Sequence, residues 1–355
     1  MLVRIPRYTE KSSALAKAAP KDPIEQAFVE RGFMLLTNPK TSLKVRKCLQ
    51  TGIPALDAIA ARDIHGVWGL PMGKQVEFAG SYDSAKTSTL IAIIAAAQKI
   101  GYKTGWEEFE HSLSRSRCEN IGADIDKLWV DTPDHLELAL ENMQDVILKM
   151  PKVGEQNYNE NKGLVMVLDS IASAPTKAEV DGKVTDSHIA EFARRMAQFQ
   201  RMMNAAIGKR NVLIVYSNQL KDKIGVMFGK RKQTYGGNAI RFHCGLRFET
   251  VYTGKLKKGN EINGITINYE SVKNKVWMPY KKIENQEFYF DGGFNYEQSL
   301  IMALESKGAI VKKGSKYEVF PLGKGEFYQR SELEKLLKSN HKLRDRLRET
   351  INAFI

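Results

Sequence analysis

The chain of 355 residues is poor in cysteine and has no long apolar run. Cys48, Cys118 and Cys244 lie far apart and form no C-x-x-C pair, so the sequence indicates neither a zinc site nor a disulfide framework and suits a reducing compartment. No apolar run approaches the roughly 18 residues of a membrane-spanning helix. The polar, basic start lacks the apolar stretch of a signal peptide. We therefore expect a cytoplasmic protein without a membrane partner.

Acidic residues are fewer than basic ones. The chain has 54 Lys and Arg against 41 Asp and Glu, which gives a formal net charge of +13. An excess of this size suits a polyanionic partner such as nucleic acid. It also suits a merely soluble basic surface, and composition alone does not separate the two. The length is sufficient for one large domain with smaller attachments.

Three segments of the chain differ in character. Residues 1–45 are interpreted as an N-terminal appendage, in which Asp22 caps a short amphipathic helix with Pro23 at its first position. Residues 46–293 alternate β-rich runs with helical stretches, and VMVLDS and VLIVYS are apolar throughout, as buried parallel strands are. Residues 294–355 predict a helix, a hairpin and a charged helical end. We expect an α/β core with a mostly parallel central sheet, a short N-terminal helical appendage for oligomerisation, and a small, basic α+β C-terminal domain.

The stretch GSYDSAKT, residues 80–87, nearly matches the phosphate-binding loop G-x-x-x-x-G-K-[ST]. It follows the strand-like KQVEFAG and precedes the helix-like TLIAIIAAAQ, so a helix start would add its partial positive charge. In such a loop, backbone N–H groups wrap the phosphates, a lysine reaches the outer phosphates and a hydroxyl binds Mg²⁺; here these are Lys86 and Thr87. Ala85 replaces the second glycine. The motif alone leaves open a working site, a decayed site and a coincidence.

Polar residues also follow other predicted strands. Asp169 ends GLVMVLDS, where its carboxylate would lie beside a metal ion or merely form a turn. In WEEFEH, Glu110 is placed to orient or deprotonate an attacking water, whereas we expect Glu107 and Glu108 to be solvated surface acids. Gln219 ends VLIVYSNQ, as a capping residue or as a sensor of a γ-phosphate.

A glycine-rich basic segment, KDKIGVMFGKRKQTYGGNAIRF, occupies residues 221–242. Long loops of this kind are usually functional or disordered. Its basic residues alternate with apolar ones, which suits binding to a nucleic-acid backbone together with insertion between bases.

Several stretches between residues 48 and 345 together carry a family resemblance: GLPMGKQVEFAG, EFEHSL, VLDSIASAPTKAEVDGKVTDSH, SNQLKDKIGVMFG, TYGGNAIRF and SVKNKVWMPY. In this order they resemble the RecA family of DNA recombinases. KIGVMFG with GGNA, and TKAE with DSH, are typical of the bacterial and phage members. They are not implied by the wider RecA-like fold of hexameric helicases and clock ATPases.

The resemblance implies a site for ATP and Mg²⁺. The nucleotide-binding residues that it implies are Gly80, Ser81, Tyr82, Asp83, Ser84, Ala85, Lys86, Thr87, Ser88, Arg117 and Asp169, with Thr87 and Asp169 as the metal ligands. The catalytic residues that it implies are Glu110, Lys86, Gln219, Lys273 and Lys275. Ser114 and Arg117 depart from the acid and the aromatic with which the family holds adenine.

The same resemblance implies DNA-binding loops at residues 179–189 and 220–236. The DNA-binding residues that it implies are Ile189, Arg194, Arg201, Lys221, Lys223, Ile224, Gly225, Val226, Met227, Gly236, Gly237 and Asn238. Ile189 and Ile224 match apolar residues that wedge between base triplets.

Lys273 and Lys275 match lysines that reach the ATP of a neighbouring subunit, and Phe242 matches an aromatic at the subunit interface. The two lysines flank Asn274 in a β-like run, so their side chains should share one face. Two ammonium groups on one face repel each other unless an anion lies between them. The γ-phosphate of a neighbour's ATP is one candidate, and a solvated basic face is the alternative.

The resemblance implies an ATP-dependent homologous recombinase that forms helical filaments on single-stranded DNA and pairs that strand with homologous double-stranded DNA, in DNA repair and the SOS response. Two alternatives stay open. One is a DNA-coating filament protein of the same fold with little ATP turnover, which Ala85 favours. The other is a ring-forming motor or helicase.

Overall fold

The computed structural model describes residues 22–35, 45–183, 190–222, 232–236, 238–320, 322 and 325–353. The chain divides into two compact units, Met1–Lys44 and Val45–Ile355. Within the described residues, no helix combines the length and the apolar character that crossing a membrane requires.

The first unit contains the helix α1 (Pro23–Glu30). The Asp22 side chain accepts a hydrogen bond from the backbone N–H of Ile24 at 2.7 Å, and Pro23 opens the helix, so the predicted cap is confirmed. No residue of α1 is buried, and Ile24, Phe28 and Val29 are at least half exposed. The helix therefore presents an apolar face to solvent.

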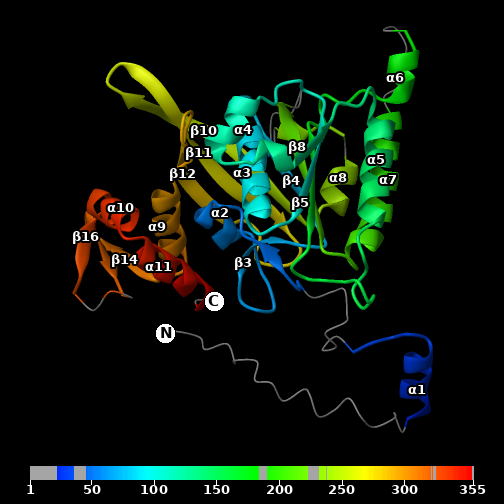
Figure 1. Cartoon of the computed structure of the whole chain (residues 1–355), viewed down its shortest axis with the longest axis horizontal. Helices are drawn as coiled ribbons and strands as arrows, with labels where there is room; N and C mark the ends of the chain where they lie inside the picture. Colours follow the sequence, from blue (N-terminus) through cyan, green and yellow to red (C-terminus); the bar gives the residue numbers. More distant parts are fainter. Residues whose placement is uncertain are drawn as a thin grey trace. The chain divides into compact units, whose positions relative to one another are not determined.

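The second unit is built on a central sheet (Figure 1). Six of its strands are parallel neighbours in the order β10 (Leu246–Lys258), β4 (Gln75–Gly80), β8 (Val212–Asp222), β7 (Leu164–Asp169), β5 (Lys103–Glu108) and β6 (Leu128–Asp131). The expected α/β core with a mostly parallel sheet is confirmed.

Helices cover both faces of this sheet (Figure 1). On one face lie α3 (Lys86–Lys99) and α4 (Arg115–Ile121), followed by the short 3-10 helix η1 (Ile125–Lys127). On the other lie α5 (Leu136–Leu148), α7 (Glu191–Ile207) and α8 (Asn238–His243). On β7, Val165 packs with the α3 side and Met166 with the α5 and α7 side. This alternation explains why the strand is apolar at every position before its last residue, Asp169.

An antiparallel extension widens the sheet beyond β10. It consists of β11 (Glu261–Asn274), β12 (Lys282–Tyr289) and the short β13 (Gly293–Phe294). The parallel pairing of β10 with β4 ends at Thr250, while its pairing with β11 continues to Lys258. The ends of β10 and β11 therefore form a hairpin that projects from the sheet (Figure 1).

A small sheet precedes the loop at residues 80–87 and was not predicted from the sequence. It has the order β1 (Cys48–Leu49), β3 (Trp68–Pro71) and β2 (Ala61–Arg62), with the helix α2 (Pro54–Ile59) beside it. Strands of two to four residues are too short to show a period of two.

The C-terminal residues contain the expected helix, hairpin and helical end. These are α9 (Tyr296–Ser306), β14 (Ile310–Lys313), β15 (Lys316–Val319), β16 (Phe327–Gln329), α10 (Arg330–Ser339) and α11 (His341–Ala353), with Asn340 between the last two helices. Their apolar cluster includes Ala58 and Trp68 from the α2–β3 region. The C-terminal elements thus share a core with that region and belong to the second compact unit.

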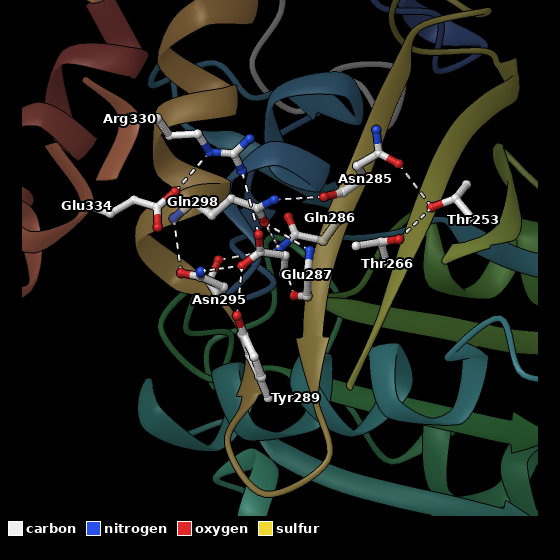
Figure 2. A network of polar contacts seen from close by, with 10 residues as sticks. All are labelled: Thr253, Thr266, Asn285, Gln286, Glu287, Tyr289, Asn295, Gln298, Arg330 and Glu334. Carbon is white, nitrogen blue, oxygen red and sulfur yellow. Dashed lines mark hydrogen bonds and ion pairs between the residues drawn. The ribbon is translucent and has the colours of Figure 1, made fainter. Parts of the chain in front are cut away.

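A polar joint fixes α9 to the sheet (Figure 2). Gln298 on α9 is 1% exposed; its amide N–H₂ donates to the Asn285 carbonyl at 2.7 Å, and its amide oxygen accepts from the Glu287 N–H at 2.9 Å. The Glu287 carboxylate accepts from Asn295 at 2.7 Å and lies 3.9 Å from Arg330 on α10. One buried amide therefore satisfies backbone groups of β12.

The joint predicts a large loss of stability for Gln298→Leu. Leucine has a similar volume but leaves the Asn285 carbonyl and the Glu287 N–H without their partner. We expect the free energy of unfolding, measured by urea denaturation, to fall by about 2–3 kcal/mol. The control is Glu305→Leu, which places the same residue at an exposed position of α9 and should change it by less than about 0.5 kcal/mol. Equal effects of the two variants would contradict the role of the joint.

Candidate functional site

Polar residues from several strands meet at the carboxyl edge of the parallel sheet. Gly80 ends β4, Asp169 ends β7, and Glu110 follows β5. The sheet register pairs Gly80 with Gln219 on β8, and Glu108 with Asp169. The structure thus brings the candidate nucleotide loop, the candidate metal ligand and the candidate γ-phosphate sensor to one edge, where ligands of such sheets bind.

The loop adopts the left-handed backbone conformation that glycine favours. Ala85 has φ 53° and ψ 30°, and Asp83 has φ 56°. A left-handed alanine costs about 1–2 kcal/mol. The Ala85 carbonyl accepts two hydrogen bonds from Thr89, from its N–H at 2.9 Å and from its hydroxyl at 2.8 Å, and the Ala85 methyl packs into the apolar core. These contacts offset the strain, so Ala85 reaches the conformation that the motif requires.

Gly80 is required for a different reason. A Cβ at this position would overlap the hydroxyl oxygens of Thr250 and Ser84. The Ser84 hydroxyl donates to the Ser81 carbonyl at 2.8 Å and lies 2.9 Å from the Thr250 hydroxyl. This buried polar contact fixes the loop against β10. Tyr82, at the tip of the loop, is 79% exposed.

Lys86 opens α3 and folds back over its own loop. Its ammonium group donates to the Ser81 carbonyl at 2.8 Å. Burial lowers the pKa of Lys86, while the negative charges of Glu110, Asp169 and Asp83 act in the opposite direction. An anion in the loop would add a further negative charge beside this half-buried ammonium and favour its protonated form.

Asp169 and Thr87 place a carboxylate and a hydroxyl side by side at the end of the loop. The Thr87 hydroxyl donates to one carboxylate oxygen of Asp169 at 2.9 Å, and the Ser217 hydroxyl donates to the other. Burial raises the pKa of Asp169 to about 6, although the two hydroxyl hydrogen bonds lower it. A hydroxyl and a carboxylate are hard oxygen donors, so these residues fit Mg²⁺, which takes few protein ligands and keeps water and phosphate oxygens as the others. Ser217 was missed from the sequence; a serine at the end of the apolar VLIVY run is the signal for it.

Glu110 is exposed at the same edge, and the Ser173 hydroxyl lies 3.4 Å from its carboxylate. The prediction for its two neighbours was wrong, because Glu107 and Glu108 are each only 3% exposed. Glu108 accepts hydrogen bonds from the Trp106 indole at 2.7 Å and from the Ser112 N–H at 3.1 Å. Burial, and then the charge of Asp131, raises the pKa of Glu107 to about 8. Both belong to β5, which lies between β7 and β6 and is covered on both faces.

Ser114 and Arg117 have local partners. Ser114 caps α4 by accepting from the Arg117 N–H at 3.3 Å. The Arg117 guanidinium donates to the hydroxyl of Ser88 on α3 at 2.9 Å. Arg117 therefore lies beside the helix that follows the loop, with its planar guanidinium next to the candidate nucleotide site.

Lys273 lies on β11 and Lys275 directly follows the last residue of that strand, Asn274; their ammonium groups lie on one face, as predicted. Both ammonium groups donate to the Phe242 carbonyl, each at 3.0 Å, and Lys273 also donates to the Arg241 carbonyl. These carbonyls belong to the last residues of α8, where a helix carries partial negative charge. Burial, and then the charge of Lys275, lowers the pKa of Lys273 to about 8. The Phe242 side chain is 66% exposed beside them.

Part of the candidate DNA-binding surface is described. Arg194 and Arg201 are exposed on α7, and exposed Lys221 lies 5.0 Å from the ring centre of Tyr235. Gly236 has φ 83°, and a Cβ there would meet Ile240 and Phe192 within 3 Å. Asn238 opens α8. The other candidates lie outside the described residues: Ile189, Lys223, Ile224, Gly225, Val226, Met227 and Gly237.

Both predicted DNA loops begin within regular structure. β8 continues past Gln219 to Asp222 and pairs with β9 (Lys232–Thr234), so the second loop is carried on a hairpin base. The first loop begins inside α6 (Lys177–Asp181), which has a capping box between Thr176 and Glu179.

The chain is similar to known proteins over most of its length. The family model of the RecA N-terminal domain matches residues 14–295. The chain is 33% identical over 348 residues to Protein RecA of Haemophilus ducreyi, covering 98% of this chain and 87% of that protein. It is 34% identical over 319 residues to Protein RecA of Mannheimia haemolytica, covering 89% and 81%. It is 33% identical over 308 residues to Protein RecA of Legionella pneumophila, covering 87% and 83%.

The loop conformation predicts the effect of Ala85→Gly. Glycine relieves the left-handed strain but adds about 0.5–1 kcal/mol of chain entropy, so the free energy of unfolding should change by less than about 1 kcal/mol. We expect equal or tighter binding of a fluorescent ATP analogue, and equal or faster hydrolysis with DNA. The control is Ala96→Gly, an ordinary helical position of α3, which should lose about 1 kcal/mol of stability. A large loss of nucleotide binding in Ala85→Gly would show that the methyl makes a required contact.

Proposed function

The chain belongs to the RecA family of DNA recombination and repair proteins, and from this premise we propose that it is an ATP-dependent homologous recombinase. It assembles into helical filaments on single-stranded DNA and pairs the bound strand with homologous double-stranded DNA. The observation that carries the proposal is the convergence of Lys86, the Thr87–Asp169 pair and Gln219 at one sheet edge.

ATP binds with its phosphates in the left-handed loop, where backbone N–H groups and the Lys86 ammonium bind the outer phosphates. Thr87 and Asp169 hold Mg²⁺, which when bound neutralises phosphate charge. Glu110 orients the attacking water and accepts its proton, and its exposure at the sheet edge leaves room for that water. Hydrolysis then removes the γ-phosphate that Gln219 senses.

DNA binding is linked to this site through β8. Gln219 lies directly before Leu220, where the pairing of β8 with β9 begins, and β8 ends at Asp222. A change at Gln219 on loss of the γ-phosphate is therefore carried by a continuous strand to the base of the second DNA loop. Lys221, Arg194 and Arg201 supply exposed cations for the DNA backbone.

Self-association is supported by several exposed surfaces. Within the first unit, α1 exposes Ile24, Phe28 and Val29. In the second unit, the edge strand β6 exposes Trp129 by 76% and Val130 by 48%. A filament covers such surfaces between copies of the chain. Lys273 and Lys275 then exchange the α8 carbonyls for the phosphates of a neighbour's ATP, with Phe242 at the same interface.

A DNA-coating filament protein with little ATP turnover is the second candidate, and the strain at Ala85 is the observation that favours it. A single-turnover ATPase measurement with and without single-stranded DNA separates the two. Stimulated hydrolysis supports the recombinase, whereas filaments without hydrolysis support the coating protein.

The proposed water-activating role predicts that Glu110→Gln slows ATP hydrolysis by about 100-fold or more, because the amide cannot accept a proton. ATP and single-stranded DNA binding should persist, and electron microscopy should show long-lived filaments. The matched control is Glu107→Gln on β5, the strand that Glu110 follows. The raised pKa of Glu107, about 8, keeps this buried carboxyl largely protonated at pH 7, so the amide should leave hydrolysis unchanged. Unchanged hydrolysis in Glu110→Gln would exclude Glu110 as the base.

Action across the interface predicts a complementation result. Lys273→Ala with Lys275→Ala should leave the monomer fold and ATP binding nearly intact, because both lysines bond only to backbone carbonyls of exposed residues among the contacts described. DNA-stimulated hydrolysis should fall to the basal rate. Mixing this variant with Lys86→Ala should restore part of the activity, at junctions where an intact loop faces intact lysines.

The control for this experiment is Lys281→Ala with Lys282→Ala, which removes two nearby exposed lysines and should leave hydrolysis unchanged. Co-assembly of the mixed variants is checked by labelling each with a different fluorophore. Mixed filaments that recover no activity would contradict action in trans.

A further inference from the structure

A buried ion pair connects the strand before the nucleotide loop with the neighbouring strand. Glu77 lies on β4, three residues before Gly80, and Arg247 lies opposite it on β10. The Arg247 Nε donates to the Glu77 carboxylate, and the two side chains are 8% and 0% exposed. Neither residue was recognised from the sequence, and neither takes part in the nucleotide or DNA contacts proposed above.

The second oxygen of Glu77 is held by Asn218, which is fully buried on β8. The Asn218 amide N–H₂ donates to Glu77 at 2.8 Å and to the Tyr235 carbonyl at 3.0 Å. Its amide oxygen accepts from the backbone N–H of Gln219 at 2.8 Å. A single side chain thus contacts the ion pair, the candidate γ-phosphate sensor and the base of the second DNA loop.

Arg247 provides a parallel connection. Its guanidinium also reaches the hydroxyl of Thr234 on β9 at 3.4 Å. In the sheet, Arg247 pairs with Glu77 on one side and with Lys273 on the other. The charges of Arg247 and Glu77 both act on the pKa of Lys273, in opposite directions. The ion pair therefore lies between the nucleotide strand, the DNA hairpin and the candidate interface lysine.

Stability alone is a weak reason for this arrangement. A buried ion pair is often no more stabilising than apolar residues of the same volume, because both charges lose their hydration. Its directional hydrogen bonds do fix the relative positions of the strands that they join. Here they join β4 and β10 to two residues at the base of one hairpin.

We infer that Glu77, Asn218 and Arg247 are positioning residues that couple the nucleotide site to the second DNA loop. When Gln219 moves on binding or losing a γ-phosphate, Asn218 moves with it. Its bonds to Glu77 and to the Tyr235 carbonyl then shift the hairpin base, while Arg247 transmits the same shift to Thr234. The coupling free energy comes from the difference in these hydrogen bonds between the state with a bound γ-phosphate and the state without it. This inference rests on the proposed roles of Gln219 and of the second loop.

The test replaces both charges at once with Glu77→Gln and Arg247→Met, so that no buried charge is left unpaired. The measured quantity is the ratio of the ATPase kcat with poly-dT to that without it. We expect this ratio to fall at least about fivefold. The KM for ATP without DNA should change less than about twofold, and the thermal unfolding midpoint should change little. A merely structural pair would instead lower the midpoint and leave the ratio of the folded protein unchanged.

The matched control is Tyr216→Phe. The Tyr216 hydroxyl donates to Gln75 at 2.6 Å between the same two strands, β8 and β4, but two residues farther from the loop. Its removal should leave the stimulation ratio unchanged. If poly-dT stimulates ATP hydrolysis equally in the wild type and in the double variant, the inference is wrong while the proposed function stands. A wild-type protein without stimulation would overturn the proposed function, and the inference with it.

Arg247→Lys serves where the double variant fails to fold. Lysine keeps the charge opposite Glu77 but lacks the second arm that reaches Thr234. We expect the ratio of kcat with poly-dT to kcat without it to lie between the wild-type value and one, which is the value when DNA does not stimulate hydrolysis. Hydrogen exchange at Leu220 and Thr234 should respond less to a slowly hydrolysed ATP analogue than in the wild type. A wild-type ratio together with a wild-type exchange response would overturn the inference.

Discussion

The hydrogen-bonded register of β4 with β8 and β10 is the constraint on which the candidate site depends. It sets Gly80 beside Gln219 on one side and beside Thr250 on the other. Because side chains alternate between the two faces of a strand, a slip of one residue would turn Glu77 away from Asn218. The same slip would separate the loop from its hydroxyl contact at Thr250. The apolar residues of both faces fix this register, so the packed core determines the geometry of the polar edge.

Burial acts on both a basic and an acidic residue of the candidate nucleotide site. Burial favours the neutral form of Lys86 and also the neutral form of Asp169, whose pKa is raised to about 6. A phosphate beside Lys86 and a cation beside Asp169 would each favour the charged form. The strain at Ala85, about 1–2 kcal/mol, is small beside such interactions. Replacing the glycine by Ala85 should therefore affect nucleotide binding less than loss of Lys86 or Asp169 would.

The long elements and the residues at their ends could be predicted from the sequence. The strands β4 to β8 and β10 to β12, the helix cap at Asp22 and the convergence of Lys86, Asp169 and Gln219 all follow from local patterns and from the geometry of parallel sheets. Burial of Glu107 and Glu108 could not be predicted in this way, because it depends on which strand becomes the neighbour of β5. The short strands β1 and β2 could not be predicted either, because two residues are too few to show a period of two. The pair of Glu77 with Arg247 joins residues that are 170 positions apart.

The partners of Lys273 and Lys275 within one subunit bear on the proposed dependence of assembly on nucleotide. Within one subunit both lysines bond to carbonyls at the end of α8, which are neutral dipoles. A phosphate carries full negative charge and is the stronger acceptor for an ammonium group. A neighbour with ATP would therefore draw the lysines away from α8. A neighbour without a γ-phosphate would offer the ammonium groups a weaker acceptor than the α8 carbonyls. Release of the carbonyls also frees the end of α8, whose first residue follows the second DNA loop. In the proposed filament, the nucleotide of a neighbour and the end of α8 would therefore be linked through the same two side chains.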